Sequence, residues 1–379
     1  MQINNKLRLA IRATAATVVL SVAGQANALT LNVGDDVEAS LYGYARMNMS
    51  YDIDGNRALS TRSGTFAPSA NEDATGHFGA DVQQSRLGVK VKHASGVAIT
   101  VEGDFRGSGH SAGSLRMRHA YGEYKGFLVG RAWSNSISFV GITPVLDFDS
   151  PAGSFGSWDR TEQIRYTSGP VSFSLEDPSA QATLDGTGRT SAPAFTARFE
   201  GSGDVLSYAA STALTQVTSD DGTTDDSAMG YAVSGGGKLK LSDMFSVQGS
   251  VSYTDGASGY LWRSGSNYYG PSAYMDGNSI ETITGYGGNI GVSMAMGGGR
   301  SINVLYAMTT LDLDDAIAVP GGTAVNTDAE TNQQILVNYM WTPVKNVMMG
   351  VEYAYLDQET VAGVSSDANR LMFAAQYSF

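Results

Sequence analysis

One stretch of sixteen residues limits the possible folds more than any other part of the chain. From Val37 to Asp52, small or apolar residues alternate with polar ones without a break in parity. Successive side chains of a β-strand point to opposite faces, so the alternation predicts one strand with an apolar and a polar face. Ordinary strands have about 5–6 residues, whereas a tilted strand in a membrane β-barrel needs ~9–11 residues in the hydrocarbon and can continue beyond it. The stretch therefore predicts a membrane β-barrel.

The last nine residues, Leu371–Phe379, predict a closing strand. Residues of one parity are apolar or small, namely Leu371, Phe373, Ala375, Tyr377 and Phe379. Because a closed barrel leaves no free edge, we expect this strand to pair with the first one. An aromatic last residue after such an alternation is typical of the signal that the barrel-assembly machinery of bacterial outer membranes binds. The alternative is the last strand of a soluble sandwich.

Strand-like segments and turns recur along the whole chain and predict an all-β, antiparallel transmembrane barrel of about sixteen strands. The expected strands are Val37–Asp52, Ser85–His93, Val97–Arg106, Leu115–Tyr124, Phe127–Trp133, Glu162–Thr167, Val171–Glu176, Phe195–Glu200, Leu206–Leu214, Tyr231–Leu241, Phe245–Thr254, Thr282–Met296, Arg300–Thr309, Gln334–Trp341, Val347–Leu356 and Leu371–Phe379.

Long and short connections alternate between these strands. The long ones are Ile53–Gly79, Gly107–Ser114, Ser134–Arg160, Asp177–Ala192, Thr215–Ala228, Asp255–Ile280, Thr310–Thr331 and Asp357–Asn369. Outer-membrane barrels have long external loops and short periplasmic turns. Because sixteen is an even number of strands, both termini are expected on the same, periplasmic side.

The N-terminus predicts export. Three basic residues precede a short apolar stretch, Ala13–Gly24, and an Ala-x-Ala motif ends at Ala28. This pattern is typical of a secretory signal peptide rather than a membrane helix. We expect residues 1–28 to be removed and residues 29–379 to form one barrel domain in the outer membrane of a Gram-negative cell.

Composition excludes several functional classes. The chain has no cysteine, which excludes disulfides and thiolate metal or redox sites. Its formal net charge is −13, which argues against nucleic-acid binding. No motif predicts a cofactor or a metal ion.

Several short motifs together resemble one family. They are Leu115–Tyr124, Gly126–Ser134, Leu41–Tyr44, Gln84–Gly88, Asp149–Gly153 and Trp341–Asn346. In order and spacing they are similar to DcaP-like outer-membrane porins of Gram-negative bacteria. The resemblance implies a sixteen-stranded, homotrimeric diffusion channel that favours small organic anions such as dicarboxylates.

The third long connection, Ser134–Arg160, is the expected constriction of such a channel. It is rich in apolar residues, which suggests packing against an inner wall. Folded inward, it would offer the carboxylates of Asp147 and Asp149 to the pore. The alternatives are a loop that caps the barrel from outside or one that contacts another subunit.

A set of cationic residues is expected to face that loop across the lumen. Most fall on the polar parity of the first six strands: Arg46, Arg86, Arg106, Arg116, Arg118, Arg131, Arg160 and Arg165. A charge near the midplane of the lipid face costs ~2–4 kcal/mol, which favours the lumen. Rings of arginine are typical of anion pathways. Alternatively, the arginines only neutralise their neighbours Glu102, Asp104 and Glu162.

Two groups of residues allow alternative functions. Aspartates crowd two external connections, at 220–226 and 312–315, where they either bridge divalent cations to lipopolysaccharide or are simply solvated. His119 falls on the outward parity near Ser114, as in barrel lipases or proteases, although no nucleophile motif accompanies it. A plugged barrel with an adhesive or structural role is a further alternative.

Overall fold

The computed structural model describes residues 29–32, 34–54, 75–107, 113–178, 188–189, 191–220, 222, 225–266, 268–319 and 329–379. The predicted signal peptide and most of the first long connection lie outside the described residues.

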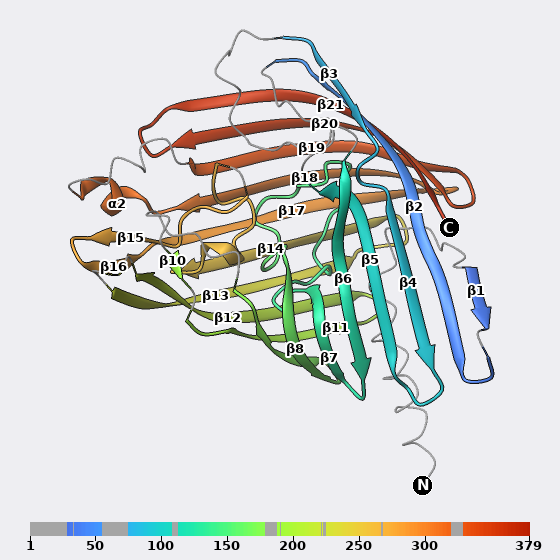
Figure 1. Ribbon diagram of the computed structural model, residues 1–379. Helices are drawn as coiled ribbons and strands as arrows, with labels where there is room; N and C mark the ends of the chain where they lie inside the picture. The colour runs from blue at the N-terminus through green and yellow to red at the C-terminus, as the bar shows by residue number, and fades with distance from the viewer. Residues whose placement is uncertain are drawn as a thin grey trace.

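Sixteen antiparallel strands form one closed barrel, which confirms the predicted fold (Figure 1). They are β2 (Val37–Asp52), β4 (Arg86–His93), β5 (Ala98–Gly107), β6 (Ser114–Tyr124), β7 (Phe127–Trp133), β8 (Arg160–Ser168), β9 (Val171–Glu176), β11 (Ala194–Ser202), β12 (Leu206–Asp220), β13 (Asp225–Lys240), β14 (Phe245–Asp255), β17 (Thr284–Gly297), β18 (Arg300–Leu311), β19 (Ala329–Val344), β20 (Val347–Thr360) and β21 (Ser365–Ser378).

The last strand closes the barrel on the first, as its sequence predicts. β21 pairs with β2 from Tyr44 opposite Ser378 to Asp52 opposite Arg370. Beyond the strand, the backbone amides of Gly43 and Phe379 each donate to the other residue's carbonyl oxygen, at 3.1 and 3.0 Å. Every strand of the barrel therefore has a partner on both sides.

The barrel strands expose apolar residues on the outer face and bury both polar and apolar residues on the inner face. In β21, Leu371 and Tyr377 are exposed, whereas Met372 and Gln376 are buried. The two faces follow from the period of two that a strand imposes on its side chains. An apolar outer band and a polar interior are what a barrel in a membrane requires.

Several short elements were not predicted. β1 (Leu29–Asn32) and β3 (His77–Asp81) pair with β2, and β10 (Gly188–Arg189) pairs with β12. A hairpin of β15 (Ala273–Asp276) and β16 (Ser279–Thr282), a short 3-10 helix η2 (Ser258–Tyr260) and α2 (Asp314–Ala318) follow in the long connections. Figure 1 shows α2 and this hairpin at the end of the barrel opposite the C-terminus. Within the described ranges, no helix is long and apolar enough to cross a bilayer.

Two expected long loops are wrong because strands occupy most of them. β12 continues to Asp220 and β13 begins at Asp225, so most of 215–228 is a hairpin. Likewise β20 continues to Thr360 and β21 begins at Ser365. These extensions are rich in Ser, Thr and Asp and have no apolar face, so hydrophobic alternation could not reveal them.

A β-bulge in β6 corrects the predicted orientation of His119. Met117 pairs with Gly103 and His119 pairs with Glu102, so Arg118 is the extra residue between them. A bulge of this kind shifts the parity of every residue that follows. His119 therefore lies on the same inner parity as Glu102, and the outward orientation expected from the sequence is wrong.

The connection 134–159 packs against side chains of the inner face. Oε2 and Oε1 of Glu352, on β20, accept hydrogen bonds from the backbone amides of Leu146 and Asp147, at 2.7 and 2.9 Å. Nη2 of Arg46, on β2, donates to the carbonyl oxygen of Leu146 at 3.1 Å. Strands from both sides of the closing seam thus hold one short stretch of this connection.

A second connection, between β14 and β15, meets the first. Nε1 of Trp262 donates to the carbonyl oxygen of Asp149 at 2.7 Å, and the amide of Gly153 donates to the carbonyl oxygen of Trp262 at 2.9 Å. The next residue, Arg263, is buried, and its carbonyl oxygen accepts a hydrogen bond from Thr309 on β18. The two connections therefore support each other against the inner face.

Candidate functional site

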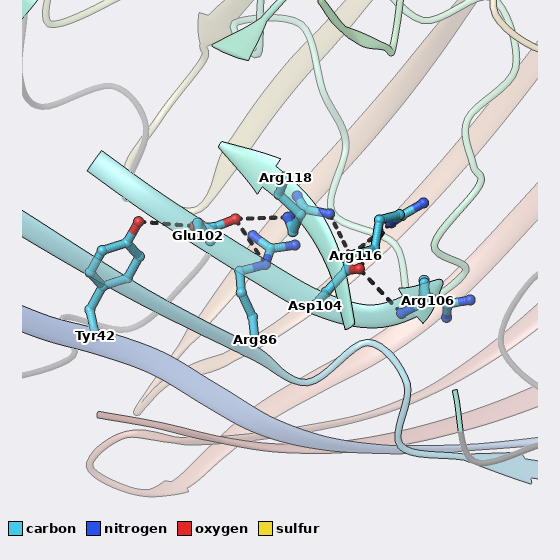
Figure 2. A network of polar contacts seen from close by, with 7 residues as sticks. All are labelled: Tyr42, Arg86, Glu102, Asp104, Arg106, Arg116 and Arg118. Atoms are coloured by element: carbon cyan, nitrogen blue, oxygen red, sulfur yellow. Dashed lines mark hydrogen bonds and ion pairs between the residues drawn. The ribbon is translucent and has the colours of Figure 1, made fainter. Parts of the chain in front are cut away.

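Two buried carboxylates on β5 organise a cluster of arginines on the inner face (Figure 2). Arg118, placed by the bulge of β6, lies between them. Its Nε donates to Glu102 Oε1 at 2.7 Å and its Nη1 donates to Asp104 Oδ2 at 2.8 Å. In the register Arg116 lies opposite Asp104. Arg118 is the extra residue of the bulge, and this is how a second arginine reaches the same carboxylate.

Two more arginines complete the cluster from either side. Arg116 binds Asp104 with two parallel bonds, from Nε to Oδ1 at 3.0 Å and from Nη2 to Oδ2 at 2.7 Å. Arg86, on β4, lies 3.3 Å from Glu102 through its Nε, and Tyr42 donates to the other oxygen of Glu102 at 3.1 Å. Bidentate pairing of this kind fixes an arginine in orientation as well as in position.

The carboxylates are covered, whereas two of the arginines stay accessible. The side chains of Asp104 and Glu102 are 0% and 8% exposed. Those of Arg116 and Arg86 are 36% and 21% exposed, and only Arg118, at 3%, is as buried as its partners. The acids hold the arginines in place from behind, so the surface that solvent reaches is cationic.

The remaining predicted arginines of the inner face differ in their surroundings. The guanidinium of Arg106 lies 4.4 Å from the ring centre of Phe148, on the connection 134–159. Arg46 is buried and bonds to Asn48 and Gln376 as well as to that connection, so its role is to anchor. Arg165 is half-buried on β8, opposite Leu128 of β7.

Arg131 does not belong to this surface. It donates from Nη1 to both carboxylate oxygens of Glu162, at 2.8 and 2.9 Å. On the same strand Leu128 and Ala132 are buried and Val129 is exposed, which places Arg131 on the outer parity. The expected pore-lining position of Arg131 is therefore wrong, because it forms a cross-strand ion pair on the outer face.

The two aspartates of the connection 134–159 are not at the surface either. Asp147 and Asp149 are 2% and 1% exposed, so they do not offer carboxylates to solvent as the sequence suggested. Burial, together with the nearby charge of Asp149, raises the pKa of Asp147. Burial also raises the pKa of Asp159 at the end of the connection. Packing of this connection, rather than its charge, determines where these groups lie.

Sequence reasoning missed several residues of the site. Tyr42 and Tyr44 line the cluster, the latter with its ring centre 5.1 Å from the guanidinium of Arg86. Glu352 could have been found, since it is the one charged residue in the first ten residues of β20. Arg263 lies in a connection without periodicity, so no sequence signal placed it near the other loop.

Known proteins resemble this chain over almost its whole length. A family model, the DcaP outer membrane protein, matches residues 13–379. The outer membrane channel DcaP of Acinetobacter baumannii is 27% identical, with a TM-score of 0.81, covering 92% of this chain and 99% of that one. No curated protein matches the chain.

More distant porin structures share the fold. An anion-selective porin from Comamonas acidovorans is 14% identical, with a TM-score of 0.59, covering 91% of this chain and 100% of that one. The trimer form of OmpT, an outer membrane protein of Vibrio cholerae, is 13% identical with a TM-score of 0.55 and the same coverage. The inner-face arginines, the closed sixteen-stranded barrel and the family match lead to one assignment: this chain belongs to the DcaP outer membrane protein family, whose barrels are porin-like channels.

Proposed function

We propose that this protein is a passive diffusion channel for small hydrophilic solutes that favours small organic anions such as dicarboxylates. The observation that carries the proposal is the exposure of the arginine cluster, in which Arg86 and Arg116 are accessible and their carboxylate partners are covered. An anion beside this surface meets guanidinium groups before it meets any acid. Arginine stays charged at every physiological pH, so the preference persists across conditions.

The proposed constriction consists of the connection 134–159 facing the arginine cluster. Its support is the set of bonds from inner-face side chains to its backbone, notably from Arg46 and Glu352. Phe148 of this connection, against Arg106, brings it next to the cluster. A narrow passage strengthens the field of fixed charges because little water remains to screen them.

Solute uptake by liposomes tests this function. Vesicles with the purified protein should swell faster in an isotonic dicarboxylate salt, such as succinate, than in an isotonic salt of a diamine of equal length. The name of the distant structural relative, an anion-selective porin, agrees with that order. No swelling in any solute would favour a plugged barrel with a structural or adhesive role. Release of fatty acid from the vesicles would favour the lipase alternative.

We further propose a homotrimer in the outer membrane, in contact with lipid and lipopolysaccharide. The trimer form of the OmpT barrel supports the assembly, and the closing strand supports recognition by the barrel-assembly machinery. An unboiled sample should migrate as a trimer on a denaturing gel, and a monomer-sized band would contradict the assembly. Mass spectrometry of the exported protein should find Leu29 as the first residue if the signal peptide is cut as proposed.

A further inference from the structure

β6 and β7 part at one point of the barrel wall, and Trp133 lies there. β6 pairs with β7 only from Ala120 to Tyr124, whereas β7 and β8 stay paired up to Trp133 and Arg160. The rings of His119, on β6, and Trp133 have centres 6.2 Å apart. An aromatic group thus occupies the place where backbone pairing ends.

Four polar atoms around Trp133 lack a hydrogen-bond partner. They are Nε and Nη2 of Arg160, Nε1 of Trp158 and Nδ1 of His119, all buried and unpartnered among the described residues. The guanidinium carbon of Arg160 lies 3.5 Å from the ring centre of Trp133, and the ring centre of Trp158 lies 6.0 Å away. A buried polar group without a partner destabilises the folded protein, because it has lost its hydrogen bonds to water. The nitrogens of Arg160 and Trp158 can only donate, so their position around one ring indicates a binding site for an acceptor.

The two nitrogens of Arg160 define the chemistry of that acceptor. Nε and Nη2 form one edge of the guanidinium, the edge that binds both oxygens of a carboxylate through parallel bonds. Of the acids nearby, Glu102 and Asp104 both bind Arg118, and the adjacent Asp159 interacts with Arg160 through its charge but forms no ion pair with it among the described residues. Within the described part of the chain, Arg160 has no ion-pair partner of its own. An anion from outside the chain that bound this edge would stabilise the buried cation.

We propose that Trp133, Trp158, His119 and Arg160 form a subsite for a planar aromatic carboxylate. This inference rests on the proposed function and names a solute class for the same channel. A carboxylate bound to the edge of a guanidinium lies in its plane, and the guanidinium of Arg160 lies against the face of Trp133. An aromatic ring conjugated with that carboxylate continues the same plane.

The neighbours of Trp133 offer such a ring aromatic surfaces. Trp158 and Phe139 have ring centres 6.0 and 5.5 Å from that of Trp133. Stacked or edge-on aromatic pairs contribute ~0.5–1.5 kcal/mol beyond the area they bury. A saturated ring of the same size has neither the planarity nor the π-system, so the subsite should distinguish the two.

Benzoate and cyclohexanecarboxylate are suitable probes because they have the same charge and nearly the same size. The protein is reconstituted in a planar bilayer, and the concentration of each that halves the chloride current is measured. We expect benzoate to act at a ~3- to 10-fold lower concentration, as expected from one aromatic pair. The chloride-to-potassium selectivity of the same membrane reports the proposed function independently.

Matched variants locate the effect. Arg160→Lys keeps the charge but removes the bidentate edge, and Trp133→Leu removes the stacking surface. Arg160→Lys should raise the half-blocking concentration of benzoate by about tenfold or more. Trp133→Leu should raise it to the value for cyclohexanecarboxylate. The controls are Arg131→Lys and Trp341→Leu, since Arg131 binds Glu162 and the ring of Trp341 stacks on that of Tyr339. If Arg160→Lys fails to fold, Trp133→Leu and the two probes on the wild type still decide.

Three results would overturn the subsite. Equal half-blocking concentrations in an anion-selective channel would leave the proposed function standing and reject the subsite. An unchanged benzoate response in both Arg160→Lys and Trp133→Leu would also reject it. Loss of the oligomer in Arg160→Lys without a change in benzoate block would mean that a carboxylate of a second copy occupies the site instead.

Discussion

Arg116 and Arg118 bind the same carboxylate, but replacing each by methionine should have different effects. Arg118→Met should mainly reduce stability, and Arg116→Met should mainly reduce anion selectivity. Arg118 is 3% exposed and bonds to both Glu102 and Asp104. Breaking a buried ion pair costs about 3–5 kcal/mol. Arg86 and Arg116 remain beside the two acids in Arg118→Met. We therefore expect a loss of unfolding free energy at the lower end of this range, about 3 kcal/mol, or roughly a hundredfold in the folding equilibrium.

Arg116→Met should cost much less stability. Its side chain is 36% exposed, and Asp104 keeps its bond to Arg118, so we expect about 1 kcal/mol. Its effect on permeation should be larger. A unit charge ~6 Å from an anion in water contributes about 0.7 kcal/mol, which is about threefold in local anion concentration.

Two assays on the same preparations separate these effects. Urea unfolding from detergent micelles gives the stability, and the reversal potential under a potassium chloride gradient gives the selectivity. Equal destabilisation of the two variants would refute the assignment of Arg118 as the buried member of the cluster. An unaltered chloride-to-potassium ratio in Arg116→Met would refute the assignment of Arg116 to the accessible surface.

Three further changes test other parts of the account. Arg370→Met breaks the fully buried pair with Asp52 across the closing seam and should destabilise the barrel by about 3–5 kcal/mol in urea unfolding, whereas Lys240→Met on the exposed turn should change nothing measurable. Glu352→Ala leaves two backbone amides of the connection 134–159 without an acceptor, at about 1–3 kcal/mol each, and should increase the noise of the open-channel current; a quiet current would contradict the anchoring role. Burial raises the pKa of Asp147 above its ordinary 3.8, so the folded state binds more protons than the unfolded state just above that pH, and stability should fall as the pH rises from about 4 towards neutrality. Asp147→Asn should flatten this dependence above about pH 4, and an unchanged slope would assign it to other groups.

Alternation alone was sufficient to predict the barrel. In β2 and β21 the lipid outside and the packed interior require opposite residue types on the two faces, so the fold is encoded in single strands. Pairing of the last strand with the first follows from closure and needs no knowledge of side chains. The extended hairpins of β12–β13 and β20–β21 could not be predicted in this way, because their outer residues are mostly polar and the contrast between the two faces is lost.

The site could be predicted only as a set of arginines. Which of them face the lumen depends on register, and the bulge at Arg118 becomes visible only when β5 is placed beside β6. Arg131 lies on a strand whose parity near Gly130, a residue with a φ of 126°, is ambiguous from sequence. The burial of Asp147 depends on contacts with Glu352, about two hundred residues away, that no local pattern contains.

The sign of the reversal potential of the wild-type protein in a planar bilayer shows whether the arginine cluster governs which ions pass. With potassium chloride more concentrated on one side, we expect stepwise currents and the potential of a membrane that prefers chloride. A potential of the opposite sign would mean that acids elsewhere in the passage outweigh Arg86 and Arg116. That result would contradict the proposed arginine-lined path.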